Sequence, residues 1–170
     1  MAVLAADLSE RAKIHVNSII INEENAADVL GDGSVSYDIE NDSLILKDAQ
    51  LSVIRTEGDL TIVLQGQNCI ANTDGMAIDV KGNLTVIGEG SLEAEGVGYG
   101  IYSGDNLSIS ENANVSVKVN SGFVDCYGIY SYMDMNIGEN AVVTVEMGAA
   151  PKNCYGIYSY DDLTIGDNAV

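Results

Sequence analysis

The pentapeptide Tyr-Gly-Ile-Tyr-Ser occurs three times in this chain, beginning at Tyr99, Tyr127 and Tyr155. A shorter motif of the type Leu-x-Ile recurs around it, and aligning the chain on that motif gives a column of aliphatic residues. The column has intervals of 24, 23, 28 and 28 residues and consists of Ile62, Val86, Ile109, Ile137 and Ile165. A period of this length is typical of repeat proteins, in which each unit packs mainly against its neighbours.

Each repeat contains three short segments of strand character and no helical periodicity. In one unit these segments are residues 128–132, 134–138 and 142–147, separated by Gly, Asn and Asp. Three short strands per unit are the pattern of one triangular coil in a parallel β-helix. The sequence therefore predicts an all-β protein, a parallel β-helix (β-solenoid) of about five three-strand coils.

Alternation along the strands assigns side chains to the two faces. Ile101, Ile129 and Ile157 are expected to point inward, and the tyrosines that follow them are expected to point outward. Because neighbouring coils stack about 4.8 Å apart, residues one period apart become spatial neighbours. This stacking explains why the same residue types recur.

The first part of the chain departs from the repeat. Residues 1–13 are interpreted as a leader remnant or flexible N-terminus, and residues 14–54 as a cap with the first strands. The cap is expected to contain a short helical turn over residues 25–33 and a hairpin over residues 34–48, covering the open strand edge of the first coil. Residues 55–170 form the repeats, which stop where another strand should begin. We expect either a truncated parent chain or self-association through the open last coil.

Composition limits the partners. Acidic residues outnumber basic residues 26 to 7, giving a net charge of −19, so binding to nucleic acid or anionic lipid is disfavoured. Direct membrane insertion is not expected, because no apolar stretch reaches the length of a membrane span. Cys126 and Cys154 occupy equivalent positions and are expected to stack as a reduced, buried pair, since in-register strands hold side chains slightly too far apart for easy bridging; the alternative is a disulfide, if a flexible loop closes the gap.

Acidic residues recur at two corners of the coils and make calcium a candidate cofactor. Stacked carboxylates repel one another, and Ca²⁺ takes several oxygen ligands of this kind. The candidate metal ligands are Glu111, Glu139, Asp167, Asp134, Asp161 and Asp162. The alternative is a solvated acidic surface that keeps the protein soluble. Asn112, Asn140 and Asn168 form a further column, interpreted as turn residues with a left-handed backbone and stacked amides.

Tyrosines are concentrated in the repeats, and an outward row of them is a candidate sugar-binding platform. Flat rings can cover the apolar faces of sugars while their hydroxyls bond to sugar hydroxyls. The candidate carbohydrate-binding residues are Tyr102, Tyr130, Tyr132, Tyr158 and Tyr160. The alternative is cross-strand packing that only stabilises the sheet. Tyr99, Tyr127 and Tyr155 have the opposite parity and are expected to pack at a corner.

Catalysis is not expected. The only histidine is His15, in the cap, and the only arginines are Arg11 and Arg55. The chain shows neither a Ser-His-Asp or Cys-His arrangement nor a glycine loop that cradles phosphate. Acid pairs are so abundant that no single pair indicates glycoside hydrolysis. We therefore interpret the protein as a non-enzyme.

Residues 29–170, with the segments "GDLTIVLQGQNCI", "GNLTVIGEGSLEAEG" and the "YGIYS" units, resemble a family of bacterial surface proteins. These are the repetitive proteins described as carbohydrate-binding domain-containing, whose characterised relatives are right-handed parallel β-helices similar to pectate lyases. The resemblance implies a right-handed coil, secretion or cell-surface location, calcium sites, and binding to plant or cell-surface polysaccharide. The alternative is a structural or adhesin-type repeat spacer that mediates protein–protein or end-to-end association without binding glycans.

Overall fold

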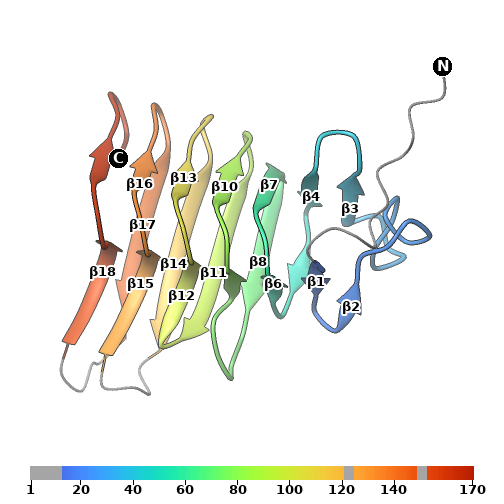
Figure 1. Cartoon of the computed structure of the whole chain (residues 1–170), viewed down its shortest axis with the longest axis horizontal. Coiled ribbons are helices and arrows are strands. Elements are labelled where there is room, and N and C mark those ends of the chain that lie inside the picture. The colour runs from blue at the N-terminus through green and yellow to red at the C-terminus, as the bar shows by residue number, and fades with distance from the viewer. Residues whose placement is uncertain (1–12, 121–124, 149–152) are drawn as a thin grey trace.

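The computed structural model describes residues 13–120, 125–148 and 153–170, and the expectation for residues 1–13 lies almost entirely outside these ranges. Every regular element in the described part of the chain is a β-strand, and the strands form three sheets that run along the long axis of the molecule (Figure 1). Sheet C consists of β17 (Val142–Met147), β14 (Asn114–Asn120), β11 (Ser91–Val97), β8 (Gln67–Ala71) and β5 (Gln50–Leu51).

The other two sheets have seven strands each. Sheet A has the order β18 (Asn153–Ser159), β15 (Asp125–Ser131), β12 (Tyr99–Ser103), β9 (Ile78–Val80), β6 (Ile54–Thr56), β1 (His15–Val16) and β2 (Ile19–Ile20). Sheet B has the order β19 (Leu163–Ile165), β16 (Met135–Ile137), β13 (Leu107–Ile109), β10 (Leu84–Ile87), β7 (Leu60–Gln65), β4 (Ser43–Lys47) and β3 (Val35–Asp38). The chain visits sheets B, C and A in turn, so the predicted parallel β-helix is confirmed.

The vertical register follows the repeat of the sequence. Ile129 pairs with Ile101 on one side and with Ile157 on the other, as the alternation predicted. The aliphatic column of sheet B is also continuous, through the pairs Ile62–Val86, Val86–Ile109, Ile109–Ile137 and Ile137–Ile165. Residues one period apart are therefore physical neighbours, whether the period is 23, 24 or 28 residues.

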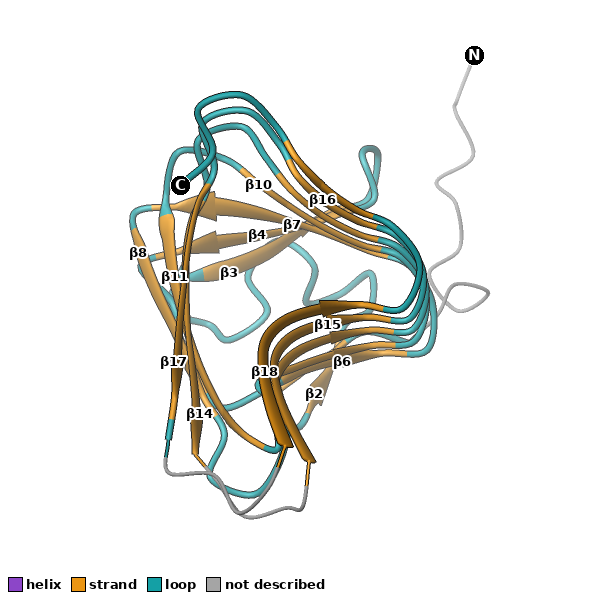
Figure 2. Ribbon diagram, turned by 90° about the vertical axis from the view of Figure 1, so that its left-hand side faces the viewer, coloured by secondary structure: helices purple, strands orange, loops and turns teal. Residues whose placement is uncertain are grey.

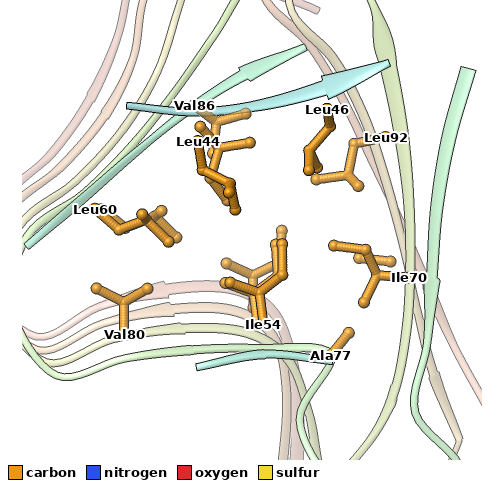
Figure 3. Close-up of a cluster of buried hydrophobic side chains, with 14 of the residues drawn as sticks. Leu44, Leu46, Ile54, Leu60, Ile70, Ala77, Val80, Val86 and Leu92 are labelled. Carbon is orange, nitrogen blue, oxygen red and sulfur yellow. The ribbon is translucent and has the colours of Figure 1, made fainter. Parts of the chain in front are cut away.

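The core is a continuous apolar column enclosed by the three sheets. Leu44 and Val86 from sheet B face Ile54 and Val80 from sheet A, and Ile70 closes the third side from sheet C (Figure 3). These five side chains are fully buried. Burying one such aliphatic side chain contributes roughly 1.5–3 kcal/mol, so each coil stabilises itself against the coils above and below it.

The N-terminal segment covers the first coil, in agreement with the cap expected from the sequence. β1 pairs antiparallel with β6, and β3 pairs antiparallel with β4, so these cap strands occupy one end of sheets A and B (Figure 1). The cap also buries Ile14, Val16 and Val29 against the core. The hairpin expected over residues 34–48 is present, since β3 and β4 flank the turn at Asn41 and Asp42.

The short helix expected within the cap is wrong. Residues 23–27 form a turn and residues 29–34 a bend, without a helix. The Asp28 Oδ1 atom accepts hydrogen bonds from the backbone amides of Gly31 (2.9 Å) and Gly33 (3.0 Å), and both glycines have a left-handed φ, of 78° and 76°. The aspartate thus takes amides that a helix would have used, and the glycines turn the chain away.

Candidate functional site

The strands that carry the pentapeptide bend sharply, which places two tyrosines of each repeat on the same side. Figure 2, seen from the C-terminal end of the coils, shows β15 and β18 curving where the Tyr-Gly-Ile-Tyr segments lie. In β12, Gly100 and Ile101 are both buried, whereas Tyr99 and Tyr102 are both half-buried. The alternation of faces therefore breaks at Gly100. Tyr99 lies on the same side of the strand as Tyr102, although counting by twos gives the two residues opposite parity.

The bend requires glycine because there is no room for a side chain at its inner face. A Cβ atom at Gly128 would overlap both a Val145 methyl group and the carbonyl oxygen of Gly156. At Gly100 a Cβ atom would overlap a methyl group of Val117. Sheet C thus packs directly against the backbone of the bend, and the tyrosine side chains project from its other side.

The tyrosines of the three repeats form two stacked columns, which we call the tyrosine corner: Tyr99, Tyr127 and Tyr155 in one column, and Tyr102, Tyr130 and Tyr158 in the other. Within the columns the ring centroids are 5.0–5.4 Å apart, with interplanar angles of 5–19°. Between the columns the rings meet edge to face, for example Tyr127 and Tyr130 at 5.1 Å and 80°. The first column, expected to pack at a corner, does so and belongs to the candidate site.

The stacking leaves parts of the rings and their hydroxyls available. The centroid spacing exceeds the 3.5–4.0 Å or so that separates carbons in van der Waals contact, so the stacked rings are not packed face to face at their closest approach. Tyr155, in the last coil, is 43% exposed. Burial raises the pKa of Tyr99, Tyr127 and Tyr130 above its ordinary value. Like any tyrosine at neutral pH, these phenols are protonated and can donate hydrogen bonds.

Tyr132 and Tyr160 form a separate pair just beyond the pentapeptide. Their ring centroids are 5.4 Å apart at an interplanar angle of 11°. They are 50% and 62% exposed, more than Tyr155. All five tyrosines predicted to contact sugar are therefore accessible at least in part, but among the described ring contacts Tyr132 and Tyr160 stack only on each other and not on the tyrosine corner.

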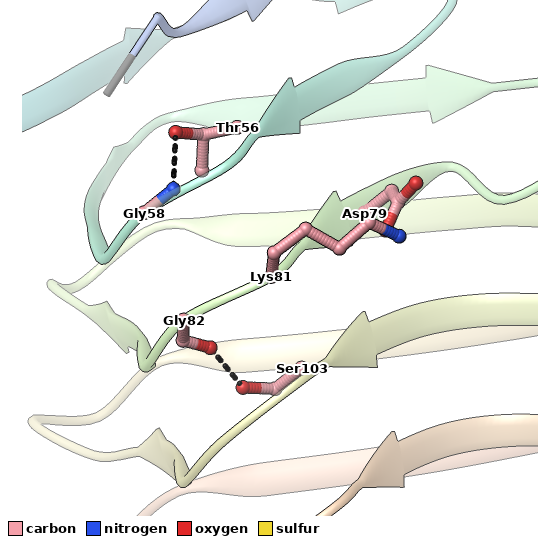
Figure 4. Close-up of polar contacts among 6 residues, drawn as sticks. All are labelled: Thr56, Gly58, Asp79, Lys81, Gly82 and Ser103. Atoms are coloured by element: carbon pink, nitrogen blue, oxygen red, sulfur yellow. Dashed lines mark hydrogen bonds and ion pairs between the residues drawn. The ribbon is translucent and has the colours of Figure 1, made fainter.

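The serine that ends each pentapeptide has a structural role that the sequence analysis missed. Ser103 and Ser131 are fully buried. The Ser103 hydroxyl lies 2.9 Å from the carbonyl oxygen of Gly82 (Figure 4) and 2.8 Å from that of Asn106. The Ser131 hydroxyl contacts the carbonyl oxygens of Asp105 and Asp134, both at 2.8 Å. Invariance within the repeat, combined with an inward parity, is the signal that could have identified this column.

The ammonium group of a lysine side chain, Lys81, lies at the N-terminal end of the tyrosine corner. The Lys81 Nζ atom is 5.0 Å from the centroid of the Tyr102 ring and 2.7 Å from the Asp79 Oδ1 atom (Figure 4 shows Lys81 and Asp79). Asp79 is the cross-strand partner of Tyr102 in sheet A. One ammonium group is therefore held jointly by an aromatic ring and a carboxylate.

The acidic column between sheets A and B caps the backbone of successive coils. The Asp134 Oδ1 atom accepts a hydrogen bond from the Asp162 amide (3.1 Å), and the Asn106 Oδ1 atom accepts one from the Asp134 amide (3.1 Å). The column continues through Asn83, which receives the Asn106 side-chain amide at 2.9 Å. Asp161 lies beside this column, exposed to solvent. Amide ladders of this kind join the coils at this corner.

The other acidic column lies at the corner between sheets B and C. Glu111, Glu139 and Asp167 are exposed there, next to asparagines whose φ angles are 63°, 59° and 59°: Asn112, Asn140 and Asn168. The left-handed backbone predicted for these asparagines is confirmed, whereas the described hydrogen bonds do not join their amides to one another.

In the described ranges no group of three or more His, Cys, Asp or Glu side chains is close enough to hold a metal ion. Calcium at either corner stays a prediction.

Cys126 and Cys154 form a disulfide, so the expectation of a reduced pair is wrong. They are cross-strand partners at the beginning of β15 and β18, with Cα atoms 4.6 Å apart. This separation lies within the range that disulfides span, of about 4.4–6.8 Å. The bond joins two coils directly beside the tyrosine corner, because Tyr127 and Tyr155 follow the cysteines.

Comparisons add no relatives to this description: no family model, curated protein or solved structure matches the chain. Within the described residues no helix is long and apolar enough to cross a membrane. The resemblance to carbohydrate-binding surface proteins, the extracellular location and the absence of catalysis therefore stay predictions. The tyrosine corner is the candidate site that the geometry brings together.

Proposed function

We propose that this protein is a non-catalytic, polysaccharide-binding β-helix of the cell surface or of secreted material, and that the tyrosine corner is its binding surface. One observation carries the proposal: six tyrosine rings line the bend of sheet A in two columns and keep part of their surface open to solvent. Rings of this kind offer apolar contact to sugar C–H groups, and their hydroxyls bond to sugar hydroxyls.

The spacing of the rings suits a chain of sugars better than a single small ligand. Successive rings are 5.0–5.4 Å apart along the axis of the coils. The length of one sugar unit in an extended polysaccharide is of the same order. A polysaccharide lying along the axis would therefore meet an equivalent pair of tyrosines at each coil, and its affinity would grow with the number of coils contacted.

The disulfide supports the proposed location. Stable disulfides are common in secreted and surface proteins and rare in the reducing cytosol of most organisms. Cys126 is only 1% exposed, whereas Cys154 is half-buried. A protein that binds polysaccharide outside the cell would meet oxidising conditions of this kind.

Binding can be tested first on a glycan array and then by calorimetry with the best oligosaccharide. Replacing both Tyr130 and Tyr158 by alanine is expected to weaken binding at least about tenfold, since aromatic residues dominate interface energies. The double variant Tyr130→Phe, Tyr158→Phe keeps the stacked rings and removes the hydroxyls. It therefore distinguishes a loss of hydrogen bonds to the sugar from a loss of sheet stability. Thr144→Ala, on the exposed face of sheet C, is the control and should bind like the parent protein. A parent protein that binds no glycan would refute the proposal.

A second candidate function is a structural or adhesin-type repeat that associates end to end. The last described coil exposes Leu163 (46%) and Ile165 (60%), whereas their partners in the preceding coil, Met135 and Ile137, are only 1% and 3% exposed. Another coil placed against β19 would cover these side chains and pair with its open edge. Light scattering tests this function: Ile165→Lys should shift any oligomer toward monomer, and a monomeric parent at high concentration would argue against it.

A further inference from the structure

The outer face of sheet C carries a hollow that is separate from the tyrosine corner. It has a volume of about 410 Å³ and crosses the first residues of strands β5, β8, β11 and β14. These strands form a different side of the coil from β15 and β18 of sheet A (Figure 2). The polar side chains that line the hollow are Gln50, Gln67, Ser91, Glu93, Asn114 and Ser116. Its size lies within the range of small-ligand sites.

The register of the strands explains why the sheet is hollowed here. Gln67 of β8 pairs with Ser91 of β11, and Cys69 pairs with Glu93. Because side chains on one face of a sheet are neighbours across and along the strands, long and short side chains alternate in both directions. The next strand, β14, continues the alternation with Asn114 and Ser116. The short side chains thus leave a space that the longer ones surround.

The polar groups of the hollow are not used by the protein itself. In the part of the chain that the structure describes, the six polar side chains named above take part in no hydrogen bond or ion pair. A hollow of about 510 Å³ on sheet B differs in this respect. There the Asn106 side-chain amide donates to Asn83 at 2.9 Å, and the Asn106 Oδ1 atom accepts from the Asp134 amide at 3.1 Å. The side chains on sheet B join the coils, whereas those on sheet C remain available to a ligand.

The chemistry of the lining favours an uncharged ligand that is rich in hydroxyl groups. Amide and hydroxyl side chains offer both donors and acceptors, and the Glu93 carboxylate can accept two hydrogen bonds at once. Two adjacent hydroxyls of a sugar ring match such a carboxylate. Among the described residues no lysine or arginine lines the hollow, and the net charge of −19 repels anions. An apolar ligand would find mainly polar side chains.

We propose that the hollow on sheet C is a binding site for neutral sugars, in addition to the tyrosine corner on sheet A. The Glu93 carboxylate, on the middle strand β11, would accept hydrogen bonds from two adjacent hydroxyls of one sugar ring. The amides of Gln67 and Asn114, on the two flanking strands, would bind the hydroxyls of the same or the next sugar. This site does not depend on the tyrosines, so the protein would hold sugar on two faces.

The test is an NMR titration of the full chain with neutral disaccharides built from glucose, galactose, mannose and xylose. At least one of them should cause saturable shifts of the side-chain amide signals of Gln50, Gln67 and Asn114. The same sugar should slow alkylation of Cys69 by iodoacetamide, because Cys69 lines the hollow and the other two cysteines form the disulfide.

Matched variants test the assigned role of the carboxylate. Glu93→Gln keeps the size of the side chain and should weaken sugar binding about tenfold, as expected for the loss of a charged hydrogen-bond acceptor. Glu146→Gln removes the same charge from an exposed position of sheet C outside the hollow and should change the affinity less than about twofold. The double variant Tyr130→Ala, Tyr158→Ala should leave these shifts unchanged.

Four results would overturn the inference. The first is a panel in which no disaccharide shifts the three amide signals. The second is equal weakening by Glu93→Gln and Glu146→Gln, which would indicate a general effect of charge. The third is tighter binding of cellobiouronic acid than of cellobiose, its neutral analogue. The fourth is loss of the shifts in the double tyrosine variant, which would assign the sugar to the tyrosine corner. Saturable shifts on sheet C without any effect of the tyrosines on glycan binding would support this site and count against the corner.

Discussion

Substituting Gly128 by alanine is the most demanding test of how the pentapeptide builds the tyrosine corner. The added Cβ atom would overlap a Val145 methyl group and the carbonyl oxygen of Gly156. The valine can move, but the carbonyl belongs to the hydrogen-bonded strand β18, which must shift as a unit. Overpacking a well-filled interior costs roughly 1–3 kcal/mol, and with backbone as one of the obstacles we expect about 3 kcal/mol.

The same repeat supplies a matched control. At Gly156, the equivalent residue of the next coil, the nearest atoms to an added Cβ are Val145 Cβ and Cγ1, both at 3.8 Å, an ordinary contact distance. Gly156→Ala should therefore change the free energy of unfolding by less than about 0.5 kcal/mol. Gly100→Ala should resemble Gly128→Ala, because its Cβ would overlap a Val117 methyl group and would also lie 2.8 Å from the carbonyl oxygen of Gly128.

Urea unfolding followed by circular dichroism measures the free energy, and hydrogen exchange shows which coils open, because a repeat protein can fray from one end. We expect Gly128→Ala and Gly100→Ala to lower the free energy of unfolding much more than Gly156→Ala does. Equal effects of Gly128→Ala and Gly156→Ala would contradict the steric reasoning. Loss of stability with an unchanged tyrosine near-ultraviolet spectrum would also contradict it, since the bend positions the rings.

Four further outcomes are expected. Ser131→Ala removes a buried hydroxyl that lies 2.8 Å from two carbonyl oxygens and can donate its one hydrogen to either, so it should lower the free energy of unfolding by about 1–3 kcal/mol in urea titration, whereas the exposed Ser116→Ala should not. Reducing the Cys126–Cys154 disulfide, which links residues 28 apart, should cost about 2–4 kcal/mol and lower Tm, and an unchanged Tm would contradict a stabilising bond. Because the pKa of Tyr99, Tyr127 and Tyr130 is raised in the folded state, their stabilisation is complete below the ordinary tyrosine pKa and is lost as pH rises through the folded value. Ultraviolet titration should show delayed ionisation of these phenols, which unfolding in urea abolishes. The calcium hypothesis for the acidic corners requires that Ca²⁺ raise Tm and that chelator reverse the rise.

Much of the fold could be predicted because a solenoid converts sequence period into spatial contact. The column from Ile62 to Ile165 and the column of Ile101, Ile129 and Ile157 could be aligned from the sequence alone, and both are continuous in the structure. Secondary structure was harder to predict where a side chain forms hydrogen bonds with backbone amides that a helix or strand would otherwise use. Asp28 captures the amides of Gly31 and Gly33, so a stretch with helical character becomes a turn.

The candidate site was only partly predictable, for a reason that lies in the bend. Alternation correctly placed Tyr102 and Tyr130 outside, but it gave Tyr127 the opposite parity and a place at a corner apart from them, because counting by twos assumes a straight strand. The strand turns at Gly128, so Tyr127 and Tyr130 meet edge to face. The disulfide was missed for a different reason: the expectation of a reduced pair treats the spacing of parallel strands, about 4.8 Å, as too wide for a bond, although that spacing and the 4.6 Å between the Cα atoms of Cys126 and Cys154 both lie in the range of about 4.4–6.8 Å that disulfides span.

The sequence by itself determined which residues stack upon which, since each repeat can bury its apolar side chains only against its own copies. Only the tertiary structure decided the shape of each coil. The direction and sharpness of the bend depend on how closely Val117 and Val145 of sheet C approach the backbone of sheet A, and that approach involves residues from different strands of the coil. Val117 and Val145 recur with the period of the repeat, but the period alone does not show that they approach the backbone of Gly100 and Gly128 and so bring the two columns of tyrosine rings together.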